Sequence, residues 1–240
     1  MRRALFPSLA VALAAAAVLA QFALRRARPA SAPAVSEGAL AALGALRSVA
    51  AEVVWFRADR LQEEGRYVEL AQLASTLAYL EPHTPEVWSH AAWNLAYNIS
   101  VMMPTPEDRW RWVRAAIRLL RDEGLVLNPG ESELYRELAW LFELKLGTDL
   151  DSAAATYREK WREIVADVER RGAWGEIGMD GAVVGDVRRG YGIDDVADPQ
   201  FSAVYWAHLG RLAARRGEDT ALLDEIIRQA RMIYFKKRGK

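Results

Sequence analysis

The residue types that most often carry chemistry are scarce in this chain of 240 residues. It has no cysteine, which excludes a thiol nucleophile, a disulfide framework and any Cys-ligated zinc or iron–sulfur site. Its histidines are His83, His90 and His208, and none of these forms the i, i+4 pair with an intervening glutamate that a helical zinc site needs. We therefore expect no metal site built on histidine or cysteine.

Other catalytic signatures are missing as well. The sequence has no Gly-x-Ser-x-Gly nucleophile elbow and no glycine-rich loop that ends in Gly-Lys-Ser/Thr. Gly181 and Gly185 have phosphate-loop spacing, but the lysine is missing and we expect no helix to follow. Asp194, Asp195 and Asp198 lack the alternating spacing of a calcium loop and are interpreted as solvated loop acids. We predict that the chain is not an enzyme and needs no cofactor.

The N-terminal segment is the most apolar part of the chain. No charged residue occurs from Ala4 to Leu24, and about 20 helical residues span a hydrocarbon core of about 30 Å. We predict an uncleaved signal anchor over residues 1–28, because the stretch is long for a signal peptide and ends in arginines; a cleavable signal peptide is the alternative. The basic residues that flank it are Arg2, Arg3, Arg25, Arg26 and Arg28.

Arginines flank this span on both sides, so the positive-inside rule favours neither orientation clearly. A short charged tail before one span more often stays inside, which would export the C-terminal domain to the periplasmic side. Residues 29–36 form a linker of proline, alanine and serine that proline stiffens. We therefore expect a single-pass membrane protein whose domain stays close to the bilayer.

From Ser36 onward, apolar residues recur with helical period, and glycine or proline occurs where helices would end. This pattern predicts an all-α fold. In a unit of about 34 residues that begins at Ala51, regular positions carry Trp55, Ala58, Leu61, Gly65, Tyr67, Leu70, Ala74, Leu77, Leu80 and Pro82. The unit resembles the tetratricopeptide repeat (TPR), which implies a solenoid of antiparallel helix pairs.

Three further helix pairs resemble the family less closely. The second pair begins at Pro85, and Thr105 is expected to cap its second helix. The third begins near Ser132 and ends near Arg171, and the fourth covers about residues 203–232. The TPR-like repeats are thus assigned to residues 37–171, a glycine-rich loop region to residues 172–200, and a C-terminal helix pair with a basic tail to residues 201–240. In the loop region, recurring glycines are expected to break any helix.

In the TPR family, the first helices of successive pairs line a concave groove. The matching positions imply a partner-binding groove formed by Trp55, Asp59, Trp93, Tyr97, Arg136 and Trp140. Other positions implied to face this groove include Ser89, Ala96, Glu133 and Glu143. Aromatic residues and arginine dominate interface hot spots, so the set favours binding of a protein or peptide. The alternative is that the aromatic side chains pack between helices.

One TPR subtype does not fit this sequence. Repeats that clamp the carboxylate tail of chaperones carry lysine, asparagine and arginine at fixed groove positions. The residues at the corresponding positions here are Trp55, Asp59, Glu133 and Glu137, so the resemblance implies no carboxylate clamp.

The charges balance overall, with 32 basic and 32 acidic residues, which argues against a nucleic-acid binder. Both ends of the chain are basic, and the part between them is acidic. We expect the C-terminal Lys236, Lys237 and Arg238 to lie against anionic lipid headgroups or an acidic partner; a solvated tail is the alternative.

Together these features predict a membrane-anchored, TPR-like scaffold or adaptor that mediates protein–protein interaction in a bacterial envelope assembly. The alternative is a structural subunit of a membrane complex, which self-associates or packs into a larger assembly without a peptide-binding groove. Neither interpretation specifies an oligomeric state or the identity of the partner.

Overall fold

The computed structural model describes residues 80–215 and 220–239, together with scattered positions between 53 and 73. Every regular element in this part of the chain is a helix, so the all-α prediction is confirmed for the described residues. The predicted anchor and linker, as well as Trp55 and Asp59, lie outside the described residues. No helix among the described residues is long and apolar enough to cross a membrane.

The chain divides into two compact units, residues 1–82 and 83–240. In the first unit, Gly65 has a φ of +69°, and it lies between the helical residues Glu63 and Glu69. This left-handed conformation favours glycine because a Cβ atom would clash with the backbone. The turn glycine that the TPR resemblance implies therefore does occupy a turn.

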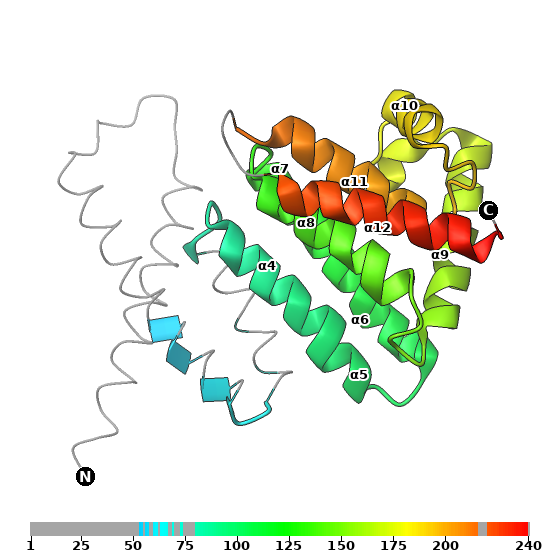
Figure 1. Ribbon diagram of the computed structural model, residues 1–240. Coiled ribbons are helices and arrows are strands. Elements are labelled where there is room, and N and C mark those ends of the chain that lie inside the picture. The colour runs from blue at the N-terminus through cyan, green and yellow to red at the C-terminus, as the bar shows by residue number, and fades with distance from the viewer. Residues whose placement is uncertain are drawn as a thin grey trace, which may run out of the picture. The chain divides into compact units, whose positions relative to one another are not determined.

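The second unit begins with three long helices, each of which contains a six-residue π-helical segment (Figure 1). The first consists of α4 (Pro85–Trp93), η1 (Asn94–Ile99) and α5 (Ser100–Met102). The second consists of α6 (Pro106–Arg118), η2 (Leu119–Gly124) and α7 (Leu125–Leu127). The third consists of α8 (Ser132–Trp140) and η3 (Leu141–Leu146).

The remaining helices complete the unit. They are α9 (Ala154–Arg171), the 3-10 helix η4 (Trp174–Ile177), α10 (Gly181–Tyr191), α11 (Pro199–Ala213) and α12 (Ala221–Lys237). The predicted fourth pair corresponds to α11 and α12, which pack against each other. The predicted end of the third pair at Arg171 is confirmed by α9, and the next residue, Gly172, has a φ of +65°.

Local signals account for several helix starts. The Thr105 side chain accepts a hydrogen bond from the backbone N–H of Asp108, and Pro106 occupies the first turn of α6, as the sequence predicts. Asp198 accepts from the backbone N–H of Gln200 at the start of α11 in the same way. These caps satisfy N–H groups that have no partner within the helix.

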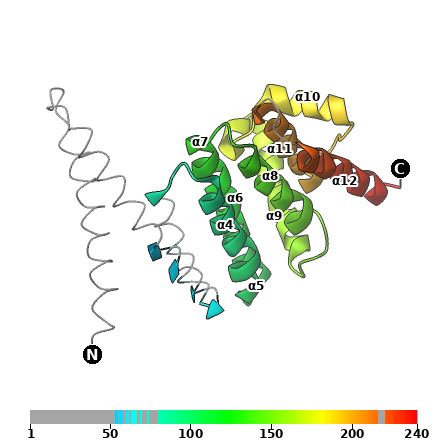
Figure 2. The same ribbon diagram turned by 60° about the vertical axis from the view of Figure 1, so that its left-hand side comes forward.

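Helix α11 lies at the centre of the unit, in contact with both α8 and α12. Its residues from Pro199 to Ala207 are all buried, as expected for a helix surrounded by others. A Cβ atom added at Gly210 would lie 2.9 Å from Tyr135 Cβ and 3.0 Å from Leu223 Cδ2. Glycine at this position therefore lets α8, α11 and α12 approach closely. On the other side of the unit, α4 packs against α6 and α8 (Figure 2).

The predicted glycine-rich loop region is wrong, because residues 181–191 form helix α10. The side chain of Asp180 caps this helix by accepting from the backbone N–H groups of Ala182 and Val183. Val184 and Val187 are buried, and packing offsets the low helix propensity of glycine. The segment from Gly181 is accordingly helical and not a loop that could cradle phosphate.

The interpretation of the nearby aspartates as solvated loop acids is also wrong for two of them. Asp195 is partly buried and forms ion pairs with Arg162 at 3.1 Å and Arg238 at 2.8 Å. Asp198 caps α11, as described above. Both carboxylates therefore make contacts that stabilise the folded chain.

Candidate partner-binding groove

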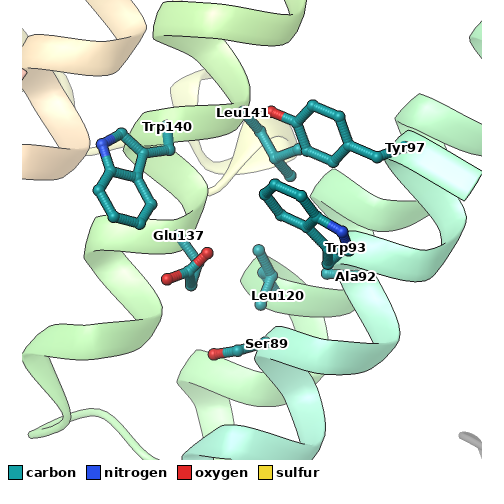
Figure 3. Close-up of a pocket in the computed structure, with 8 residues that line it drawn as sticks. All are labelled: Ser89, Ala92, Trp93, Tyr97, Leu120, Glu137, Trp140 and Leu141. Carbon is teal, nitrogen blue, oxygen red and sulfur yellow. The ribbon is translucent and has the colours of Figure 1, made fainter.

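Four of the predicted groove residues lie close together in the structure. Trp93 and Tyr97 come from α4 and η1, and Arg136 and Trp140 come from α8. Figure 3 shows the Trp93 and Tyr97 rings on one wall of a narrow pocket and Trp140 on the other. Leu120 of η2 and Leu141 of η3 also line it. Three of the four residues thus line one pocket, and Arg136 lies over the Trp140 ring.

The aromatic side chains of this groove are ordered by their helix spacing. Trp93 and Tyr97 are four residues apart, which places them on one face, and their rings stack with centroids 4.1 Å apart. The guanidinium carbon of Arg136 lies 5.3 Å from the centroid of the Trp140 ring, within cation–π range. Trp93 remains 50% exposed although its neighbours Ala91 and Ala92 are buried. A large aromatic surface is therefore presented to solvent at the mouth of the groove.

Acidic side chains supply the electrostatic character of the groove. Arg136 Nη2 lies 3.1 Å from Glu137 Oε1 and 3.8 Å from Glu133 Oε1. Ser89 Oγ of the facing helix donates to Glu133 Oε1 at 3.2 Å. Burial raises the pKa of the Glu137 carboxyl, against the opposing effect of Arg136. The two carboxylates thus share one guanidinium.

Two positions that the TPR resemblance implies for the groove are in fact in the core. Ala96 is fully buried, and only 1% of the surface of Glu143 is exposed. Ala96 lies in η1 and Glu143 in η3, where π-helical bonding from i to i+5 changes the angular spacing of side chains. At these two residues, the positions taken from a regular α-helix therefore predict a groove-facing side chain where the side chain is in the core.

A second cluster next to the groove was not anticipated from the sequence. Asp151 Oδ2 lies 2.6 Å from Lys145 Nζ, and both side chains are almost completely buried. Asp151 also accepts from Tyr157 and pairs with Arg109. Burial lowers the pKa of Lys145, and the ion pair with Asp151 opposes this shift. The only sequence signal was Lys145 between two leucines near the end of η3, and a lysine ordinarily marks a solvated position.

The same cluster borders a cavity of about 430 Å³ that Tyr97 shares with the groove. Lys145 Nζ lies 4.9 Å from the centroid of the Tyr97 ring. Burial also raises the pKa of Tyr97 above its ordinary value, so its hydroxyl stays neutral in the physiological range. Because Lys145 is already paired with Asp151, its charge is largely compensated within the fold.

No protein-family model, curated protein or solved structure significantly matches this chain. The TPR resemblance consequently rests on the sequence pattern. Among the described residues, no group of three or more histidine, cysteine, aspartate or glutamate side chains is placed to hold a metal ion. His83 Nδ1 lies 3.2 Å from the Leu127 carbonyl oxygen, and His208 Nδ1 lies 3.0 Å from the Tyr191 hydroxyl.

Two residues of the predicted lipid-facing tail make contacts within the domain. Lys237 Nζ donates to the Gly147 carbonyl at 2.7 Å. The Arg238 guanidinium pairs with Asp195 and lies 4.4 Å from the centroid of the Tyr234 ring. The N-terminal arginines that were predicted to flank the membrane lie outside the described residues.

Proposed function

We propose that this protein is a membrane-anchored, TPR-like scaffold whose groove between α4 and α8 binds a protein or peptide partner in an envelope assembly. The observation that carries the proposal is that Trp93 and Tyr97 line one pocket together with Trp140 of the facing helix, whose ring lies under Arg136. The repeat positions in the sequence predict all four of these residues for the groove. The anchor rests on the uncharged stretch between Ala4 and Leu24.

The exposure of Trp93 favours binding over a purely structural role. A tryptophan that only packs between helices would bury most of its ring, but half of Trp93 faces solvent. The ring is also held in place by stacking on Tyr97, which lowers the entropy lost when a partner covers it. Pre-ordered aromatic residues are typical of binding hot spots.

The test is capture of partners from native membranes by the full-length chain after crosslinking. A double variant, Trp93→Ala with Trp140→Ala, is expected to lose specific partners at least about tenfold, because hot-spot truncations cost about 2 kcal/mol or more each. Leu212→Ala is the matched control, since Leu212 is 69% exposed on α11, outside the groove. Unchanged capture by the double variant, with unchanged helical circular dichroism, would refute the groove.

The same variants distinguish the structural-subunit alternative. If the purified wild-type protein forms a defined oligomer that the double variant no longer forms, the groove is a self-association surface. In that case, the occupant of the groove is a second copy of this chain and not a separate partner. Size measurement by light scattering in detergent decides between these outcomes.

A further inference from the structure

The carboxylate of Glu137 lies between the two aromatic walls of the groove. Glu137 and Trp140 both belong to α8, three residues apart, which places them on the same face. Figure 3 shows the carboxylate between Trp140 on one side and Trp93 on the other, with Ser89 close to it. A partly buried acidic group flanked by aromatic rings suits a positive charge, because the carboxylate is negatively charged and the ring faces carry negative electrostatic potential.

The groove already contains one cation held in this manner. Arg136 stacks on the Trp140 ring and pairs with Glu137. Its contact with Glu133 is 3.8 Å long, beyond hydrogen-bond distance. One guanidinium therefore serves two carboxylates, and the groove keeps an excess of negative charge. Arg136 thus contacts both an aromatic ring and a carboxylate, and one of the two negative charges remains uncompensated.

Partial burial makes the negative charge of Glu137 less stable than it would be in water. The pKa of its carboxyl is raised by burial despite the adjacent Arg136, so the ionised form is incompletely stabilised. The neighbouring Lys145 does not supply the missing charge, because Asp151 lies 2.6 Å away and pairs with it. A cation from outside would stabilise the ionised carboxylate, whereas an acidic or purely apolar group would not.

The space between Trp93 and Trp140 is only about 10 Å³, whereas half of Trp93 faces solvent. We propose that the groove binds a lysine or arginine side chain of a protein partner, with its charged end against Glu137 and its aliphatic stem over the exposed face of Trp93. This inference rests on the proposed function and specifies the partner: a segment that carries an exposed basic residue. The stem of such a side chain covers aromatic surface while its charge reaches the carboxylate. Ser89, which donates to Glu133, adds a hydroxyl to the lining of the same pocket.

A displayed library of random peptides, selected on the full-length protein in lipid nanodiscs, tests the partner chemistry. We expect the selected peptides to be enriched in lysine or arginine and to lose binding to Trp93→Ala. Selection of acidic or apolar peptides that still require Trp93 would overturn the cation proposal and leave the groove intact. If no selected peptide requires Trp93, the proposed function fails together with this inference.

A double-mutant cycle then locates the charge. Replacing the anchoring lysine of a selected peptide by norleucine, or Glu137 by glutamine, is expected to weaken binding about tenfold. The two changes together should weaken binding little more than either alone, because they remove the same interaction. Glu159→Gln, which changes an exposed carboxylate on α9, is the matched control. Fully additive losses would overturn the assignment of Glu137.

Discussion

Glu143 gives the folding stability of this protein a specific pH dependence. Its side chain is 1% exposed, and its Oε1 atom has no hydrogen-bond partner among the described residues. Burial raises the pKa of this carboxyl to about 7, and the negative charge of Glu225 adds to the shift. In the unfolded chain the group returns to its ordinary value of 4.5. The native state therefore holds a proton that the unfolded state releases at lower pH.

The sign and size of the effect follow from this difference. The contribution of Glu143 to the free energy of unfolding is greatest below pH 4.5 and is lost as the pH rises through 7. Between pH 5 and pH 8 the loss amounts to about 2.5 kcal/mol, at about 1.4 kcal/mol for each pKa unit. Replacing Glu143 by glutamine removes the titration and keeps the shape of the side chain.

Urea denaturation of the full-length chain, followed by circular dichroism at pH 5 and pH 8, measures this loss. Relative to wild type, Glu143→Gln should gain about 2.5 kcal/mol more at pH 8 than at pH 5. Glu225→Gln should show a smaller change of the same sign, and the exposed-site variant Glu159→Gln should show none. An equal effect of Glu143→Gln at both pH values would refute the reasoning.

Further variants test the helix packing and the buried ion pair of the second unit. Gly210→Ala should lower the free energy of unfolding by about 1–3 kcal/mol, because its Cβ would lie 2.9 Å from Tyr135 Cβ. Gly190→Ala in α10 is its control; it has no atom within 4 Å of the added Cβ and should be neutral or stabilising by up to about 1 kcal/mol in the same denaturation assay. Lys145→Met should destabilise the protein by about 3–5 kcal/mol, because it leaves Asp151 buried without its closest cation. Adding Asp151→Asn to Lys145→Met should restore part of this loss, and a double variant that is less stable than Lys145→Met would contradict the ion-pair explanation.

The elements that could be predicted from the sequence depend on residues close to one another in the chain. Thr105 and Pro106 specify the start of α6, and Gly172 follows the last residue of α9. The spacing of Trp93 and Tyr97 places both rings on one helix face. Capping, helical period and the i, i+4 relation involve residues within about two helical turns of one another, so they can be recognised in the sequence.

Other features arise from residues far apart in the chain. Helix α10 forms despite its glycines because Val184 and Val187 are buried and because the backbone N–H of Asp180 donates to the hydroxyl of Tyr205 on α11. The burial of Glu143 depends on the π-helical geometry of η3, which sets the direction of the side chain, and on the packing of η3 against α11. Likewise, the repeat positions bring Glu137 near Trp140, but only the approach of α4 to α8 places the carboxylate opposite Trp93. Local interactions decide where a helix begins and which face is apolar, whereas the environment of a charge is decided by whatever the folded chain packs against it.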